Sequence, residues 1–215
     1  DGTLERWFAQ PSEHTPPLHR LGVDEMTHLD RSIWLNSVLS PRPVVIAGTL
    51  DKEGNRNFAP LSSVMAVSTA PPYLTASFSI HKDGRHRDTL TNMRTSGRIL
   101  LNMMPATQRG VELVDETATP LPQGEDEGLL LEDFKTLEGQ PLIISDSVAA
   151  IEAEYVEEHE LPGAVARIAV LRVNAVWFSS TAIPVGGLAV LCQHGRDDMT
   201  PAPNGWKKRV TKHYG

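Results

Sequence analysis

Hydrophobic and polar residues follow one another in short runs along most of the chain, a pattern typical of β-strands. Apolar residues fill Val44–Leu50, and the Asp51-Lys52-Glu53-Gly54 sequence after them predicts a hairpin turn with the glycine at positive φ. Further strands are predicted over Asn57–Val67 and Tyr73–Ile80. They are separated by Pro71-Pro72, because prolines lack the N–H that strand pairing uses.

Helical spacing of apolar residues appears in two shorter segments. One helix is predicted over Asp88–Ser96, with Asp88 or Thr89 capping its start and Gly97 ending it. A second short helix is predicted over Thr107–Glu116. The helices are few and short, so they are expected to flank a body made of strands.

The second half of the chain returns to strand patterns. Strands are predicted over Ile99–Met104 and over 151–155, where apolar residues alternate with Glu, whereas the acidic stretch 117–128 is predicted to be a surface excursion. Val165–Phe178 is apolar on both faces, which predicts that a second subunit covers its outer face. Many strands with few helices favour a mainly β fold, a closed or split antiparallel barrel.

Length and composition fit a single domain. The 215 residues include 40% hydrophobic residues, enough for a core, and we expect one domain over 31–215. Residues 1–30 are rich in Pro, His and charge, and are predicted to form an irregular arm packing on the body. The formal net charge of -7 argues against general binding of nucleic acid, whose affinity depends on neutralising phosphates.

The cellular compartment is inferred from features that the sequence lacks. The single cysteine, Cys192, excludes an intrachain disulfide, and no apolar run is long enough to span a bilayer. The N-terminus also lacks a basic segment followed by an apolar one. We therefore expect a cytoplasmic protein with no membrane partner.

Two groups of polar residues could recognise a ligand. Hydroxyl groups on neighbouring predicted strands could bond the polar edge of a ring system such as an isoalloxazine; they belong to Ser62, Ser63, Ser77 and Ser79. Cations at Arg85, His86 and Arg87 precede the unpaired amides of a helix start, an arrangement that favours an anion. From these residues alone, solvent-facing serines and a solvated loop remain open alternatives.

Several short motifs stand in a specific order between residues 41 and 104. They are Pro41-Arg42-Pro43, Thr49, Asn57-Phe58-Ala59-Pro60-Leu61-Ser62, Pro71-Pro72 and Arg87-Asp88-Thr89, followed by Asn92 and Gly97. Together they resemble the flavin reductase-like family of FMN-binding split barrels. The resemblance implies a split antiparallel β-barrel with a few short flanking helices, and a homodimer with FMN near the subunit interface.

The resemblance also implies positions for the cofactor. The backbone of Ala59–Val64 would face the flavin, Ser77–Ser79 would line its ribityl side, and Arg87 with Thr89 would hold the phosphate. The full implied set of FMN-binding residues is Thr49, Asn57, Ala59, Pro60, Ser62, Ser63, Val64, Ser77, Phe78, Ser79, Arg87 and Thr89. Because the flavin supplies the reactivity, no catalytic acid or base is assigned.

The activity that the resemblance implies is an NAD(P)H:flavin oxidoreductase. NADH or NADPH would reduce the flavin, which would then serve a flavin-accepting oxygenase or another electron acceptor. Many short flavin reductases carry Gly-x-His-Thr before the last long strand, where this chain has Gly163-Ala164-Val165-Ala166; His159 could substitute or be a surface residue. The missing histidine favours the alternative of an FMN-containing electron carrier without NAD(P)H turnover. A non-enzymatic split-barrel binder of haem is a third reading.

The remaining groups of polar and glycine residues predict no further binding or catalytic site. His194, Asp197 and Asp198 are nearly consecutive in one polar loop, whereas metal ligands normally converge from separate elements, so no metal site is expected. Gly186-Gly187 resembles the C-terminal Gly-Gly turn of the family. The basic segment Trp206–Val210 is predicted to be a solvated terminal helix. No Gly-x-Gly-x-x-Gly motif for a dinucleotide is present.

Overall fold

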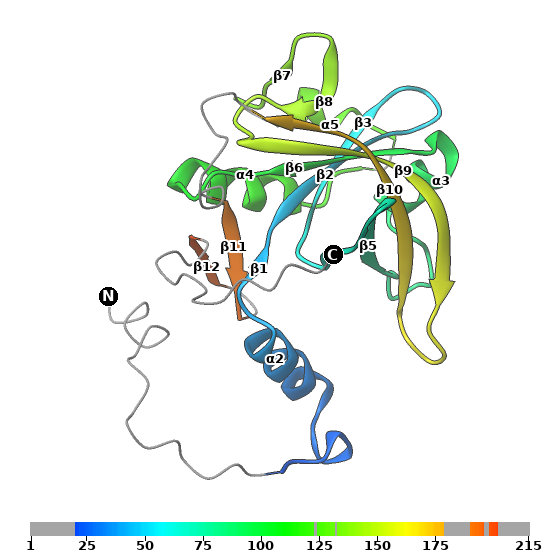
Figure 1. The fold of residues 1–215 in the computed structure, drawn as a ribbon, viewed down its shortest axis with the longest axis vertical. Coiled ribbons are helices and arrows are strands. Elements are labelled where there is room, and N and C mark those ends of the chain that lie inside the picture. Colours follow the sequence, from blue (N-terminus) through cyan, green and yellow to red (C-terminus); the bar gives the residue numbers. More distant parts are fainter. Residues whose placement is uncertain (1–19, 123, 132, 179–189, 196–197, 202–215) are drawn as a thin grey trace.

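A seven-stranded antiparallel sheet forms the body of the protein (Figure 1). We describe it from a computed structural model that covers residues 20–122, 124–131, 133–178, 190–195 and 198–201. The spatial order of the strands is β3-β2-β6-β9-β10-β5-β4. Their bounds are β2 Val45–Leu50, β3 Arg56–Leu61, β4 Val64–Thr69, β5 Pro72–Ser79, β6 Arg98–Met103, β9 Ala149–Glu160 and β10 Ala166–Phe178. The mainly β, antiparallel prediction is confirmed.

A two-residue connection gives the sheet its curvature. β3 and β4 are the two edge strands of the sheet, yet only Ser62 and Ser63 separate them in the sequence. Three steps between successive Cα atoms span at most about 11 Å, so the two edges must come close together. The sheet therefore curls into a barrel that is left open between β3 and β4, as the split-barrel prediction requires. We call Ser62-Ser63 the seam.

This arrangement corrects one sequence-based expectation. Asn57–Val67 was expected to be a single strand, but the chain leaves β3 at Leu61 and starts β4 at Val64 on the opposite edge. Pro60 still pairs with Ile46 of β2. After Leu61, Ser62 and Ser63 carry the backbone across to the opposite edge of the sheet. An alternation of apolar and polar residues does not reveal such a change of edge.

Smaller elements surround the barrel. They are a three-stranded sheet of β1 (Arg42–Pro43), β11 (Leu191–His194) and β12 (Asp198–Pro201), and a hairpin of β7 (Thr136–Leu137) and β8 (Gln140–Ile144). The helical elements are η1 (Val23–Glu25), α2 (His28–Val38), α3 (Asp88–Ser96), α4 (Gln108–Ala118) and α5 (Glu127–Leu130). None of the helices in the described part of the chain is long and apolar enough to cross a membrane.

Helix α2 extends away from the barrel in Figure 1, and none of its residues is buried. It begins at His28 and so crosses the expected boundary between the arm, 1–30, and the domain, 31–215. Residues 1–19 lie outside the described part of the chain. The division into arm and domain therefore stays a prediction.

The apolar core lies on both sides of β2. Val45 and Ala47 face the barrel interior with Leu90 and Met93 of α3, so this helix packs against the inside of the barrel. Ile46 faces the other way, into a cluster with residues from α4 and β8. Strand β2 is consequently buried along almost its whole length, which explains its uninterrupted apolar sequence.

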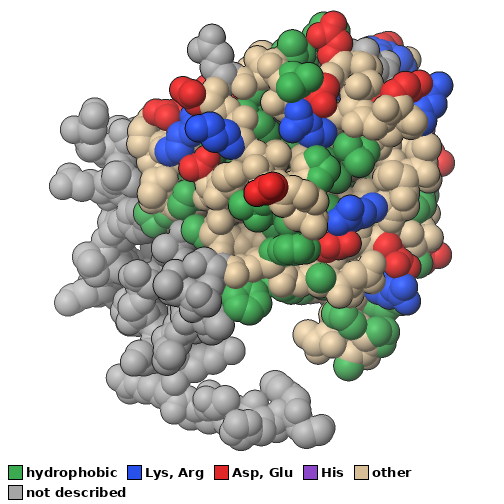
Figure 2. Space-filling view, turned by 90° about the horizontal axis from the view of Figure 1, so that it is seen from above, with side chains coloured by type: hydrophobic (Ala, Val, Ile, Leu, Met, Phe, Trp, Pro, Cys, Tyr) green, Lys and Arg blue, Asp and Glu red, His purple; other side chains and the backbone are tan. Residues whose placement is uncertain are grey.

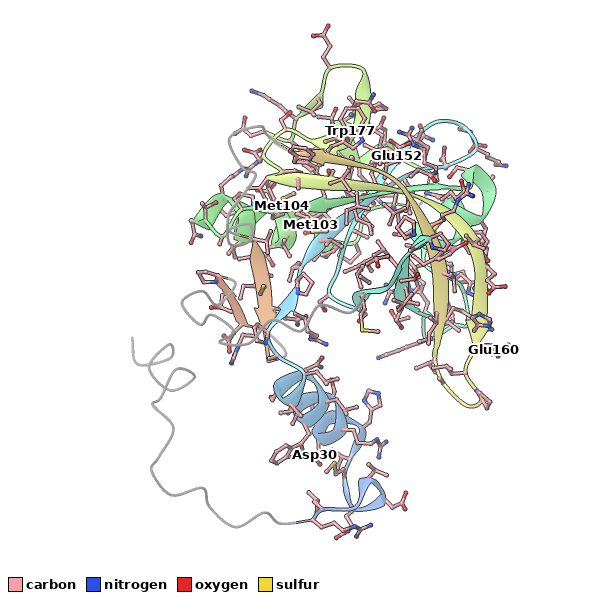
Figure 3. All side chains as sticks on the ribbon, viewed as in Figure 1. Asp30, Met103, Met104, Glu152, Glu160 and Trp177 are labelled. Atoms are coloured by element: carbon pink, nitrogen blue, oxygen red, sulfur yellow. The ribbon has the colours of Figure 1, made fainter. Side chains whose placement is uncertain are left out.

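Polar pairs hold the outer surface of β9 and β10. Trp177 donates its indole N–H to Glu152 over 3.3 Å, and Glu152 also pairs with Arg98 at 3.1 Å. Figure 3 labels Trp177 and Glu152 on these two strands. On the face shown in Figure 2, Lys and Arg side chains are mixed with Asp and Glu. That face therefore carries no single-sign field of the kind that attracts a polyanion.

Asn102 joins the barrel to the β7–β8 hairpin. This fully buried side chain donates to the carbonyls of Ile46 and Leu142, each over 3.0 Å. Its carbonyl oxygen accepts from the N–H of Ile144 over 3.0 Å. Removing such a group leaves buried backbone atoms without partners, each at a cost of roughly 1–3 kcal/mol.

We predict that Asn102→Leu lowers the free energy of unfolding by roughly 3 kcal/mol, because it keeps the branched shape of the side chain but abolishes these hydrogen bonds. Urea denaturation followed by circular dichroism measures the change. The matched control is Asn174→Leu, since Asn174 is exposed and makes one hydrogen bond, to Glu154. Equal stability losses for the two variants would contradict a structural role for Asn102.

Candidate functional site

A cavity of about 510 Å³ opens beside the seam. This volume lies in the range of small-molecule sites, about 300–1,000 Å³. Its walls are strand β3 with the seam, the end of β5, the start of α3, and the last residues of α4 with those that follow them. The lining residues are Asn57–Ser63, Ser77–Ser79, His81, Arg87–Thr89, Thr117–Leu121, Glu127 and Ala166.

Hydroxyl groups gather where the two sheet edges meet. The N–H of Ser77 donates to the carbonyl of Ser63 over 3.0 Å, which places the end of β5 against the seam. The hydroxyls of Ser62, Ser63 and Ser77 remain available, since the described residues offer them no hydrogen bond. Pro60 adds apolar surface to the same cavity, whereas Phe78, which also lines it, has its side chain buried in the interior core. A flat ring with a polar edge fits this combination of groups.

The start of helix α3 forms the second feature of the cavity. Its N-cap residue is Arg87, which has extended backbone and makes no side-chain capping bond, so the first amides of the helix lack a side-chain acceptor. The expectation that Asp88 or Thr89 caps the helix is therefore wrong; Asp88 is the first helical residue. The predicted end at Gly97 is confirmed, with φ 70°. Free amides at a helix start favour an anion.

Arg87 reaches along the cavity from this helix start. Its Nε donates to Ser79 Oγ over 3.3 Å, which links the cation to the end of β5. This bond uses one edge of the guanidinium and leaves its terminal nitrogens able to bind phosphate oxygens. Neighbouring Arg85 instead forms an exposed pair with Asp83 at 2.8 Å.

A buried polar network fixes the floor of the cavity. Asn57 donates to Thr89 Oγ1 over 3.0 Å and lies 3.4 Å from Thr49 Oγ1. Asn92 of α3 also donates to Thr49 Oγ1, over 3.4 Å. Since Thr89 accepts from Asn57, its own O–H proton is free to be donated into the cavity. The network thus joins β2, β3 and α3 and orients the Thr89 hydroxyl.

The stretch 117–128 is not simply the surface excursion that the sequence predicted. Thr117–Leu121 line the cavity, and the residues after them are fastened along the exposed edge of β3. We call these contacts the clasp: Asn55 Nδ2 to Gly124 O over 2.9 Å, Arg56 Nε to Asp126 Oδ1 over 2.7 Å, and the Phe58 N–H to Glu127 Oε2. The clasp supplies partners for an edge strand that would otherwise present free groups.

Glu127 is the unusual charge of this region. The pKa of its carboxyl group is raised to about 7, chiefly by burial; the Phe58 N–H opposes this rise, and the nearby negative charges of Asp88 and Asp126 add to it. The closest cation of the clasp, Arg56, is already paired with Asp126. Glu127 therefore changes charge near neutral pH.

The structure brings most of the sequence-predicted residues together. All of them line the cavity except two: Thr49, which is fully buried beneath Asn57, and Val64, which packs against the interior core. The roles of the whole set as FMN ligands stay predictions. The sequence reading missed Glu127 and the Thr117–Leu121 wall. Apolar Leu121, within the stretch 117–128, and Leu131, just after it, were the available signal, and Leu131 packs against the apolar core.

Other residues that the sequence singled out lie away from the cavity or outside the described part of the chain. His159 is exposed on β9 and lies 3.3 Å from Glu157, away from the residues that line the cavity. His194 ends β11 and Asp198 begins β12, while Asp197 lies outside the described residues. The Gly186-Gly187 turn and the basic tail at 206–210 also lie outside them.

Comparison with known proteins identifies relatives of this chain. The family model described as "Flavin reductase like domain" matches residues 38–194. The Bacillus subtilis (strain 168) protein YwrF, itself described as uncharacterized, is 31% identical over 105 residues. That alignment covers 49% of this chain and 50% of YwrF, so the match spans about half the length of the curated relative.

Solved structures share the fold. Nitrilotriacetate monooxygenase component B from Bacillus cereus superposes with a TM-score of 0.78 at 20% identity, covering 90% of this chain and all (100%) of that one. The FMN-binding protein from Thermus thermophilus, solved with p-hydroxybenzaldehyde, gives a TM-score of 0.64 at 22% identity. Its superposition covers 80% of this chain and 92% of that one. At these identities the likeness concerns the fold.

Proposed function

We propose that this chain, which belongs to the flavin reductase-like domain family, binds FMN non-covalently and reduces it with NADH or NADPH. One observation carries the proposal: a single cavity holds the seam hydroxyls at one end and the uncapped start of α3 at the other. These two ends match a molecule with a polar-edged ring and a phosphate. The solved FMN-binding protein from Thermus thermophilus, which shares the fold, supports the choice of cofactor.

At the phosphate end, three kinds of donor would hold the anion. They are the first amides of α3, the free guanidinium nitrogens of Arg87 and the hydroxyl of Thr89. Asn57 keeps the Thr89 oxygen as an acceptor and so turns its proton outward. Thr49 contributes indirectly, by holding Asn57 and Asn92.

At the ring end, the seam would orient the isoalloxazine. Ser62 and Ser63 offer hydroxyls, and Ala59 and Pro60 offer backbone and a small apolar surface. The Thr117–Leu121 wall would limit access of water on the side of α4. When bound, FMN would supply the two-electron chemistry, and the protein would supply orientation and electrostatics.

We further propose that reduced flavin serves a partner, either an oxygenase or another electron acceptor. The fold shared with nitrilotriacetate monooxygenase component B supports this reading, because that protein is by name one component of a monooxygenase. The second candidate function is an FMN-containing electron carrier. It is favoured by the Gly163-Ala164-Val165-Ala166 sequence, which has no histidine before β10, and by the exposed position of His159.

A homodimer is part of the proposal. The last residues of β10 expose large apolar side chains: Val176 is 54% accessible, Trp177 37% and Phe178 54%. Val176 and Phe178 share one face of the strand and Trp177 points to the other, and large exposed apolar groups usually mark an interface. A second copy of this chain would cover them, as the apolar sequence on both faces of β10 predicted.

The first prediction concerns the phosphate. Wild-type protein should bind FMN more tightly than riboflavin, and Arg87→Ala should weaken FMN binding about tenfold while leaving riboflavin unchanged, because it removes one charged contact to phosphate. Fluorescence titration with both flavins measures this. Arg85→Ala is the control, since Arg85 pairs with Asp83. Equal wild-type affinity for the two flavins would refute the phosphate assignment.

The second prediction separates reductase from carrier. Anaerobic addition of NADH or NADPH to the FMN complex should bleach the absorption of the oxidised flavin within seconds to minutes, because enzymes typically turn over at roughly 1–1,000 per second. Dithionite serves as the control for a reducible flavin. If dithionite bleaches the band and both pyridine nucleotides fail, the carrier function replaces the reductase.

The third prediction concerns assembly. Light scattering at micromolar concentration should give twice the 23.6 kDa chain mass, because dimerisation would bury the exposed end of β10. Trp177→Lys should shift the mass toward the monomer, since a charge would then be buried at the interface. Lys substitution at exposed Leu137, on the β7–β8 hairpin, is the control. A monomeric wild type would contradict the dimer.

A further inference from the structure

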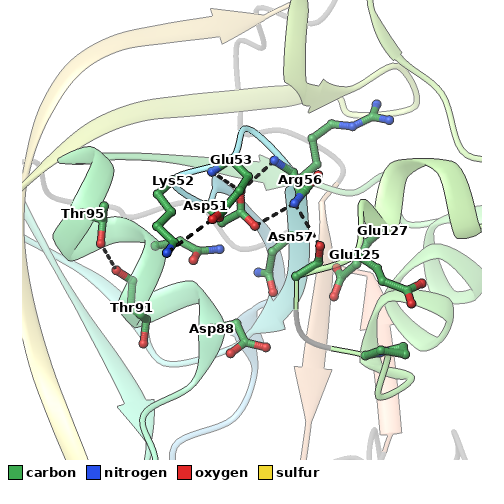
Figure 4. A pocket seen from close by; sticks show the side chains of 14 residues that line it. Asp51, Lys52, Glu53, Arg56, Asn57, Asp88, Thr91, Thr95, Glu125 and Glu127 are labelled. Carbon is green, nitrogen blue, oxygen red and sulfur yellow. Dashed lines mark hydrogen bonds and ion pairs between the residues drawn. The ribbon is translucent and has the colours of Figure 1, made fainter.

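The candidate flavin cavity adjoins a second cavity. The second one has a volume of about 280 Å³ and lies between the β2–β3 hairpin, helix α3 and the clasp (Figure 4). Asn57, Asp88 and Glu127 line both cavities. The two spaces therefore meet beside the start of α3, where the flavin phosphate is proposed to bind. A ligand that continues beyond its first phosphate would have to pass this junction to enter the second cavity.

Carboxylates dominate this junction and the space behind it. In Figure 4 the side chains of Asp88, Glu125 and Glu127 lie around the second cavity. The cations nearby are engaged: Lys52 pairs with Glu53 at 3.3 Å and Arg56 pairs with Asp126 at 2.7 Å. The charged or titratable groups around Glu127 come from both cavities: His81, Arg87 and Asp88 beside the start of α3, Asp126 of its own segment, Arg56 of β3, and Asp51, Lys52, Glu53 and Glu125 around the second cavity.

The anion donors lie on the side of the first cavity. Arg87 and Thr89 line the first cavity and not the second. A single phosphate at the start of α3 can therefore face donors with its oxygens. A second phosphate, placed toward the second cavity, would face Asp88 and Glu127 instead. Two like unit charges about 4 Å apart in a solvated site repel strongly enough to change affinity about tenfold.

We propose that Asp88 and Glu127 make the site select a flavin that ends at its first phosphate, FMN, over a dinucleotide flavin, FAD. This inference rests on the proposed function, since it assumes that the flavin phosphate binds at the start of α3. Both residues are specificity determinants that act through charge. Glu127 is held in position by the Phe58 N–H and by the clasp on either side of it.

The proposed discrimination depends on pH. The pyrophosphate of FAD keeps its charge from pH 6.5 to 8.5, whereas the carboxyl group of Glu127, with a pKa of about 7, ionises across this range. Raising the pH therefore adds a negative charge at the junction. Wild-type affinity for FAD should fall by about tenfold from pH 6.5 to 8.5, as one added unit-charge repulsion implies.

The experiment measures dissociation constants for FMN and FAD by fluorescence titration, at pH 6.5 and 8.5, in the full chain. Glu127→Gln should improve FAD binding at pH 8.5 roughly tenfold more than FMN binding, and should flatten the pH dependence for FAD. Asp88→Asn is the second variant and should narrow the preference for FMN at both pH values. The matched control is Glu112→Gln, which removes an equal charge from α4 outside both cavities.

The outcomes separate this inference from the proposed function. A changed FAD-to-FMN ratio in both junction variants but not in Glu112→Gln supports the selection. Equal improvement of both flavins would overturn it, because the carboxylates would then act on the first phosphate alone. Tight FAD binding by wild type at pH 8.5, equal to that of FMN, would also overturn it while leaving a flavin site in place. Absence of binding for both flavins would reject the proposed function itself.

Discussion

The short connection between β3 and β4 is the constraint on which the rest of the molecule depends. Two residues cannot cross an open, flat sheet of seven strands, so the sheet has to curl until its edges almost meet. Curling creates the interior that α3 fills with Leu90 and Met93. It also brings the seam next to the end of β5, and thus fixes the position of the candidate cavity. Fold and site follow from the same geometric requirement.

The second organising feature is the use of an edge strand as a platform. One side of β3 pairs with β2, and the other side is met by the clasp. Gly124, Asp126 and Glu127 bind the residues of this edge. The same segment places Thr117–Leu121 along the cavity. Protection of a strand edge and construction of a ligand wall are therefore achieved by the same segment, which has to keep a buried carboxyl group, Glu127, to do so.

The sequence predicted local features well where the signal was local. Helix α3 matches its predicted bounds, because apolar spacing and Gly97 both lie within one segment. The sequence could not reveal that Asn57–Val67 divides between two edges of the sheet, because strand pairing joins residues far apart in the chain. Most residues of the set that the motif resemblance implied line the cavity, but the wall at 117–121 and Glu127 arise from tertiary contacts that no short pattern encodes.

The seam also sets where this architecture can vary through evolution. An insertion between Leu61 and Val64 would let the two edges of the sheet separate, so the length of this connection is under a strict geometric limit. The stretch after α4 joins no two edges of the sheet, and between the contacts of the clasp its length is limited only by the small cost of lengthening a loop. Related chains can therefore lengthen, shorten or recharge that wall while keeping the barrel intact. New ligand preferences would accordingly arise by changes at 117–131, and the seam would remain constant.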